Sequence, residues 1–401
     1  MLGDCIPVRL SLALFWLTIS FMPVSAFLPP PVILPVVPTT TAATTSCRTA
    51  TLDPSDTTTT ATTTTTTTNI NNNNDNDIVT NTDTSTLTLL EHINLNVPNQ
   101  VSVLPFYWGV LGCGMDPRKA ANLLPASAKK TLWANCGASQ FHLPYGETAQ
   151  RIPGHVGLRY KDLEGLKLRL AAVEENVCTY QIIQPVGGVG GAREAVRVTD
   201  RYGNVFVCRE GPDRVDPTAF RQPIIGRHET ETWGDVATTY GCVETECRGI
   251  DYVEFQCPTG TAAQIALFYE SVLDATTSVV QDGDTAVAVV AFGKVDENGK
   301  ADQSLLFRET DETIPPYDGH HVAMYVGESK ADFAQAFKNA DMAGVVWVNP
   351  RFSDKAHTLQ GAQKWKQFRF KDIVDMETGQ KIFELEHEMR SVEHEAWPGS
   401  L

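Results

Sequence analysis

The stretch EHINLNV, residues 91–97, decides the fold because its side chains alternate strictly between apolar and polar. Ile93 and Leu95 fall on one side, and His92 and Asn94 fall on the other. A β-strand places successive side chains on opposite faces, so the pattern predicts a strand with one apolar and one polar face. If the polar face lines a cavity, His92 is a candidate metal ligand or base.

Similar strands open three further segments of the chain, and a helix-like stretch follows each of them. The four opening strands are EHINLNV (91–97), GHVGLRY (154–160), DYVEFQC (251–257) and HHVAMYV (320–326). Two or three shorter strand candidates come after each helix-like stretch, such as AVRVTD and NVFVCR in the second segment. One segment alone cannot bury both its helix and its sheet. We therefore expect the segments to pair, each pair forming a curved sheet with helices on one face and a cup on the other.

This repeat predicts an α+β fold of four tandem βαβββ modules that form curved mixed sheets in two domains. The modules are expected to pair in chain order, the first with the second and the third with the fourth. The predicted division is a signal peptide over 1–26, a disordered Thr/Asn/Pro-rich transit peptide or linker over 27–88, a first domain over 89–210, a connector over 211–247, a second domain over 248–392 and a tail over 393–401.

The N-terminal segment has the pattern of a signal peptide. Arg9 precedes the apolar run 10–24, and the small residues of VSA (24–26) form a cleavage site. A retained membrane anchor is the alternative, which the short run and the adjacent cleavage site disfavour. Phe27 and the Thr-rich run after it resemble the bipartite plastid presequence of diatoms and related algae. Asp53 and its acidic neighbours depart from that pattern, so secretion with a Thr-rich stalk is the alternative to a plastid location.

Composition limits the partners. The 401 residues carry a net charge of −16 and no basic stripe, which argues against a nucleic-acid partner. Of nine cysteines, Cys136, Cys178, Cys208 and Cys257 lie in apolar strand-like runs, where a free thiol behaves as a small hydrophobe. We expect reduced thiols, which suits a plastid stroma.

Several motifs together resemble the vicinal oxygen chelate superfamily, which includes glyoxalase I, extradiol dioxygenases, and fosfomycin and bleomycin resistance proteins. The motifs are EHINLNVPN, LPFYWGVLG, PGHVGLRYKDLEGLKLRL, VTDRYGNVFV, GHHVAMYV and DMETGQKIFELEHE. The resemblance covers the chain from Leu89 to about Val392. It implies one divalent metal in a cup, held by ligands from the first and last strands of paired modules. The metal would bind two oxygens of a substrate as a Lewis acid.

In the cup expected from the first two modules, the resemblance implies His92, Gln140 and His155 as metal ligands. Imidazole and amide oxygen suit zinc, iron, manganese or nickel. Val207 stands where metal-dependent relatives carry a Glu, and His142 is the candidate to replace it and to act in catalysis. The alternative is that the histidines are hydrogen-bonded strand residues of a metal-free pocket.

The cup expected from the last two modules offers a second candidate site. Its residues would be Tyr252, Glu254, His321, Glu384 and Glu386. An extradiol-type dioxygenase would have two His and one Glu there, whereas this set has one His. Glu384 could act as a base. The favoured alternative is that the Glu residues form a solvated edge.

The functions that follow from the resemblance are a glyoxalase I-like lyase or isomerase, or an extradiol-type dioxygenase, acting on a small oxygen-rich molecule. The alternative is a non-catalytic protein that sequesters a small molecule. A third possibility is that one cup is degenerate and serves packing or a homodimer. The Gly-rich stretch VGGVGGAR, 186–193, is expected to be a hairpin loop, because it lacks the spacing of a dinucleotide-binding motif.

Overall fold

The computed structural model describes residues 85–116, 119, 122, 130–184, 194–211, 246–297 and 299–397. The predicted signal peptide and the hairpin loop at 186–193 lie outside these residues, as do residues 27–84 of the predicted linker and most of the connector. The first strand begins at Leu87, slightly before the boundary predicted at residue 89. Among the described helices, none is long and apolar enough to cross a membrane.

Four modules of strand, helix and strands follow one another, and the predicted α+β class is confirmed. The first contains β1 (Leu87–Asn94), η1 (Val101–Val103), the π-helix η2 (Pro105–Val110), β2 (Gly114–Met115), β3 (Leu132–Cys136) and β4 (Ser139–Leu143). The second contains β5 (Gly154–Tyr160), α2 (Glu164–Ala172), β6 (Cys178–Ile183), β7 (Ala195–Asp200) and β8 (Val205–Glu210). The third contains β9 (Cys247–Pro258), α4 (Ala262–Leu273), β10 (Thr277–Asp282), β11 (Thr285–Val295) and β12 (Ala301–Thr310). The fourth contains β13 (His321–Val326), α5 (Lys330–Met342), β14 (Val346–Trp347), α6 (Leu359–Trp365), β15 (Gln367–Phe370), β16 (Ile373–Val374), β17 (Lys381–Phe383) and β18 (Glu386–Ser391).

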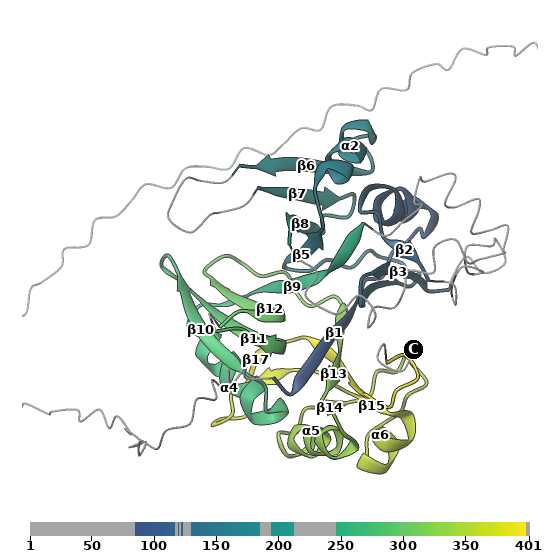
Figure 1. The fold of residues 1–401 in the computed structure, drawn as a ribbon. Helices are drawn as coiled ribbons and strands as arrows, with labels where there is room; N and C mark the ends of the chain where they lie inside the picture. The colour runs from purple at the N-terminus through teal and green to yellow at the C-terminus, as the bar shows by residue number, and fades with distance from the viewer. Residues whose placement is uncertain are drawn as a thin grey trace, which may run out of the picture. The chain divides into compact units, whose positions relative to one another are not determined.

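The sheets pair the modules differently from the prediction. The first sheet has the order β14-β15-β18-β13-β1-β4-β3-β2 and joins module one to module four. The second sheet has the order β10-β11-β12-β9-β5-β8-β7-β6 and joins module two to module three (Figure 1). The expected pairing of module one with two and of three with four is therefore corrected. Each sheet draws on both halves of the chain, so a split at 89–210 and 248–392 does not describe the sheets.

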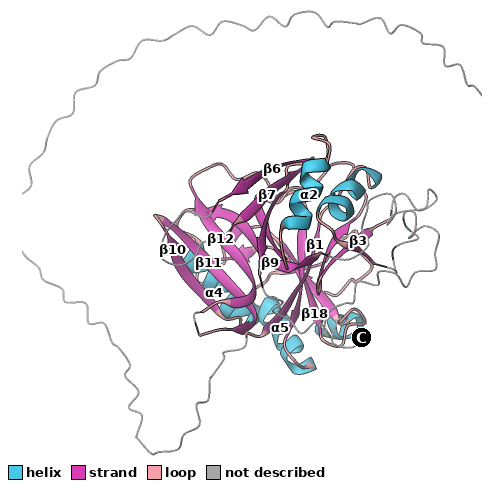
Figure 2. Ribbon diagram, turned by 45° about the horizontal axis from the view of Figure 1, so that its top comes forward, coloured by secondary structure: helices cyan, strands magenta, loops and turns pink. Residues whose placement is uncertain are grey.

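Helix packing, by contrast, follows the order of the chain. Helix α2 contacts η2 of the first module, and α4 contacts α5 of the fourth. Figure 2 shows the helices in cyan and the strands in magenta. The core continues from one sheet to the other, because the ring of Phe141 in β4 lies 5.8 Å from that of Phe206 in β8. The alternation of each opening strand fixes which face is apolar, but all four opening strands share this pattern, so it does not specify which strands are neighbours.

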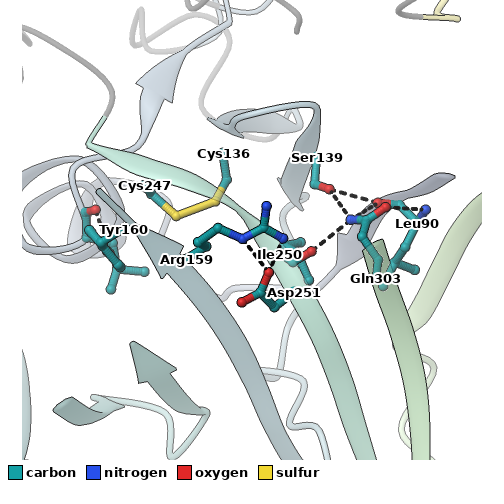
Figure 3. Close-up of a disulfide and its surroundings, with 10 residues drawn as sticks. Leu90, Cys136, Ser139, Arg159, Tyr160, Cys247, Ile250, Asp251 and Gln303 are labelled. Atoms are coloured by element: carbon teal, nitrogen blue, oxygen red, sulfur yellow. Dashed lines mark hydrogen bonds and ion pairs between the residues drawn. A yellow bond between two sulfur atoms is a disulfide. The ribbon is translucent and has the colours of Figure 1, made fainter. Parts of the chain in front are cut away.

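A disulfide joins the two sheets. Cys136 at the end of β3 is bonded to Cys247 at the start of β9 (Figure 3). The expectation of a reduced thiol at Cys136 is therefore wrong. Cys178, Cys208 and Cys257 are free and buried, as predicted.

The amide of Gln303 in β12 forms a second connection between the sheets (Figure 3). Its Nε2 donates to the carbonyl oxygens of Leu90 and Ile250 and to Oγ of Ser139, and its Oε1 accepts from the backbone N–H of Leu90. Gln303 is buried, so these bonds satisfy an amide that would otherwise be costly to bury.

Candidate metal centre

Four strands of the first sheet bring polar side chains to one face, which we call the cup face of the first sheet. His92 of β1 lies beside Gln140 of the parallel strand β4. His321 of β13 lies beside Glu386 of the parallel strand β18. Modules one and four thus contribute a His from the opening strand and an amide or carboxyl from the closing strand at matching places. Period-two alternation keeps each of these side chains on the same face as its neighbour.

A buried group of two histidines and one glutamate lies at the centre of this face. His92, His321 and Glu388 are all buried, and their potential ligand atoms lie within 4.8 Å of one another. Oε2 of Glu388 lies 3.6 Å from Nε2 of His321 and 4.0 Å from Nε2 of His92. Three donor atoms from three strands are therefore close enough to share one metal ion.

His92 is held in the form that a metal requires. Its Nδ1 lies 2.5 Å from Oε2 of Glu91, and a carboxylate can only accept, so Nδ1 carries the proton. Its Nε2 is buried and has no hydrogen-bond partner. Burial lowers the pKa of His92 to about 4, although the charge of Glu91 opposes the shift. The imidazole is thus neutral at pH 7, with the lone pair of Nε2 directed away from Glu91.

Glu388 is held as a carboxylate by two arginines. Burial opposes its ionisation, but the charges of Arg369 and Arg390 outweigh that effect and hold the pKa of Glu388 well below its usual range. Arg390 donates from Nε to Oε1 of Glu388 over 2.7 Å, and Arg369 donates from Nη2 to Oε2. Arg390 also donates to Glu91 over 2.7 Å, which links Glu388 to the partner of His92.

The buried network around these arginines carries an excess of negative charge. Arg369 also binds Asp354 and Glu386, each over 2.8 Å. The four acidic members are Glu91, Asp354, Glu386 and Glu388, and the two basic members are Arg369 and Arg390. Four carboxyl groups against two guanidinium groups leave an excess of two acidic groups in a buried site. Buried carboxylates in excess of buried cations are costly, and a divalent cation among them would lower that cost.

Gln140 presents its oxygen to the same face. Its Nε2 donates to Oδ2 of Asp116 over 2.9 Å and to Oδ1 of Asn135 over 2.5 Å. These bonds leave Oε1 facing Nε2 of His142, 3.1 Å away. The ring of His142 stacks on that of His92 with centroids 3.7 Å apart, and burial holds the pKa of His142 well below its usual range.

Asn94 adds an unsatisfied donor. It lies two residues beyond His92 on β1 and opposite His321 on β13. Its side chain is buried, and Nδ2 has no hydrogen-bond partner. A buried amide N–H without a partner costs free energy, so a ligand oxygen in this cup would relieve that cost.

The structure separates His155 from the other predicted metal ligands. His155 lies on β5 of the second sheet, where Nε2 is 3.1 Å from the hydroxyl of Tyr252. Its Nδ1 is 3.4 Å from Oε1 of Glu254. His92 is instead brought together with His321, which the sequence assigned to the other cup.

The glutamates of the last module have different surroundings. Glu384 pairs with Lys371 over 2.6 Å and with Lys381 over 2.9 Å, and it is not a member of the His–His–Glu group. Glu386 is on the cup face but accepts from Asn349 and Arg369. Sequence reasoning did not select Glu388, although the alternation of FELEHE places it on the same face as Glu386. The solvated-edge interpretation does not hold for Glu386 and Glu388, because both are buried.

Comparison with known proteins gives similarities of structure at low sequence identity. No model of a protein family and no curated protein matches the chain. Glyoxalase I of Zea mays superposes with a TM-score of 0.46 at 13% identity, over 76% of this chain and 92% of that one. A putative dioxygenase of Bacillus subtilis gives 0.44 at 12% identity, over 76% and 85%. A 2,3-dioxygenase of Pseudomonas sp. KL28 gives 0.24 at 16% identity, over 75% and 91%. These values are too low to carry conclusions about activity, so the function has to be argued from the side chains of the cup.

Proposed function

We propose that the cup of the first sheet binds one divalent metal ion through His92, His321 and Glu388, with Oε1 of Gln140 beside it. The observation that carries the proposal is the buried, unpartnered Nε2 of His92 next to two further donor atoms. Two imidazoles and one carboxylate suit iron(II), manganese or zinc, and the set contains no thiolate.

The chain's own residues would prepare the site for a small molecule with two neighbouring oxygens. A bound metal ion would act there as a Lewis acid on those oxygens. Burial keeps His92 neutral and Glu91 holds its proton at Nδ1, while Arg369 and Arg390 keep Glu388 charged. The free N–H of Asn94 would donate to a substrate oxygen and orient it.

We propose dioxygenation as the reaction class, in the manner of an extradiol dioxygenase. Two His and one carboxylate with open positions form the ligand set of many non-haem iron(II) oxygenases. A glyoxalase-like isomerisation requires a base that takes a proton from carbon. The carboxylates of Glu386 and Glu388 are both engaged by arginine, and the amide of Gln140 cannot act as a base. This comparison favours the dioxygenase over the lyase or isomerase.

A non-catalytic small-molecule binder is the second candidate. The observation in its favour is the same engagement of the cup carboxylates, because carboxylates held by arginines suit binding as well as they suit metal-centred oxidation. The two candidates differ in turnover, since only the enzyme consumes oxygen in proportion to substrate.

Oxygen uptake by the full chain, reconstituted anaerobically with iron(II), tests the proposed reaction on a panel of catechols. We expect uptake that is lost in His321→Ala and kept in His155→Ala, the matched change in the second sheet. Isomerisation of the hemithioacetal of methylglyoxal and glutathione, without oxygen uptake, would contradict dioxygenation and support a glyoxalase-like isomerase. Catechol binding without either reaction would support the second candidate, the non-catalytic small-molecule-binding protein.

A further inference from the structure

The second sheet has its own cup face, which carries His155, Tyr252 and Glu254 and lies apart from the metal centre. Strand pairing places Arg197 of β7 opposite Val207 of β8. Val207 lies beside Gly157 of β5, and Gly157 lies opposite Tyr252 of β9. Period-two alternation therefore puts Arg197 in one row with Tyr252 across the sheet.

Two further arginines belong to this face. Arg209 follows Val207 by two residues on β8, and Arg308 lies on β12. Arg308 binds Glu254 over 3.1 Å and Asp282 over 2.9 Å. Arg197 and Arg209 are exposed, and within the described parts of the chain neither has an ion pair or hydrogen bond.

Tyr252 and His155 supply neutral polar groups to the centre of this face. A Cβ on Gly157 would lie 2.1 Å from a ring carbon of Tyr252, so the absence of a side chain at Gly157 lets the phenol ring lie across β5. Burial raises the pKa of Tyr252 to about 12. Burial lowers the pKa of His155, whereas the charge of Glu254 raises it. The charges of Arg197, Arg308 and Arg209 add to the lowering. Tyr252 and His155 can thus exchange hydrogen bonds with a ligand without adding charge.

We propose that the cup face of the second sheet binds a small molecule bearing carboxylate or phosphate groups, without a metal ion. Arg197 and Arg209 are diagonal neighbours on β7 and β8, a separation of about 7–8 Å between backbones, so both can reach one ligand. Guanidinium groups bind these anions through paired hydrogen bonds. Arg159 of β5 lies on this face as well, but it pairs with Asp251, and Arg308 pairs with Glu254 and Asp282. Arg197 and Arg209 therefore carry the positive charge that no described carboxylate binds. Tyr252 and His155 would contact the uncharged part of the ligand.

Calorimetric titration of the metal-free full chain with inorganic phosphate and, separately, with succinate tests the site at fixed ionic strength. We expect saturable binding of at least one probe, and the stronger probe identifies the anionic group. The double variant Arg197→Ala and Arg209→Ala should weaken that binding at least tenfold. Arg201→Ala is the matched control, because Arg201 lies in the turn between the same two strands with its guanidinium over Tyr202.

The Glu388→Gln variant separates this site from the metal centre. The proposal predicts the same affinity for phosphate or succinate in Glu388→Gln as in the wild type. Failure of both probes to bind would overturn it. Equal weakening by Arg201→Ala would overturn it too, since it would show diffuse attraction to surface charge, and so would loss of binding in Glu388→Gln.

Discussion

Nε2 of His321 lies 3.6 Å from Oε2 of Glu388, although the two residues stand on the first and last strands of the same module. The contact arises because β13 and β18 run parallel and side by side, with β13 next to β1 of the first module. His92 of β1 therefore completes a buried group that no single module contains. The pairing of modules one and four is what creates the proposed metal site.

Arg369 is expected to be the most sensitive side chain of the buried network. Replacing it with Met leaves Asp354, Glu386 and Glu388 without their shared cation. Breaking a buried ion pair from one side typically costs about 3–5 kcal/mol. Urea denaturation should show a loss of this order. Lys371→Ala, which removes a partly exposed partner of Glu384, should cost less than about 1 kcal/mol. Equal losses in the free energy of unfolding for the two variants would contradict the stabilising role of Arg369 in the buried network.

His387 should make the stability of the metal-free chain depend on pH. Burial lowers its pKa to about 3, and its Nε2 lies 2.5 Å from the hydroxyl of Tyr269. Since the unfolded chain binds a proton near pH 6.5 and the folded chain only near pH 3, the unfolded state binds more protons between these values. The free energy of unfolding should therefore decrease as the pH falls through this window. One such group contributes up to about 1.4 kcal/mol per pH unit.

Urea denaturation at several pH values, with chelator present, measures this slope. His387→Leu should reduce this slope by the equivalent of about one proton, because the variant lacks the imidazole that takes up a proton on unfolding. His357→Leu, at an exposed histidine, should leave the slope unchanged. A slope that is the same in the wild type and His387→Leu would show that His387 already takes up its proton in the folded state.

Removing the buried side-chain amide of Asn94 or of Gln303 should affect the free energy of unfolding in different ways. Nδ2 of Asn94 has no partner, whereas the amide of Gln303 satisfies the carbonyls of Leu90 and Ile250. Without a ligand, Asn94→Leu should be neutral or stabilising. Gln303→Leu should be destabilising by about 1–3 kcal/mol for each buried group left unpaired. Comparable destabilisation by both changes, measured as free energies of unfolding, would mean that Asn94 has a structural role.

The bond between Cys136 and Cys247 should contribute to stability. It closes a loop with a sequence separation of 111, and loops of this size correspond to about 3–5 kcal/mol in the chain-entropy model. Unfolding of the wild type should therefore shift to lower urea in the presence of a reductant. Cys136→Ser should unfold at that lower concentration with or without reductant. No effect of reductant on the wild type would indicate that the thiols are reduced in the isolated protein.

Much of the fold and part of the candidate site follow from the sequence. Alternation in EHINLNV and SQFHL identifies the faces that carry His92 and Gln140, because side-chain direction in a strand is a local property. The pairing of modules is not local, and the four opening strands share one pattern. For that reason the sequence pattern predicts His155 beside His92 and places His321 in the other cup, whereas the structure brings His92 and His321 together. The sequence pattern does not single out Glu388, because three alternating glutamates are equivalent until the register of β18 with β13 is known. The partnership of Cys136 with Cys247 likewise depends on how the two sheets meet.

Metal content of the full chain, purified without a His-containing tag and reconstituted with iron, zinc, manganese or nickel, tests the central claim most directly. The account predicts close to one ion per chain in the wild type and in His155→Ala. It predicts loss of that ion in His92→Ala, His321→Ala and Glu388→Gln. Metal that persists in those three variants, or that disappears only in His155→Ala, would contradict a metal centre in the first sheet.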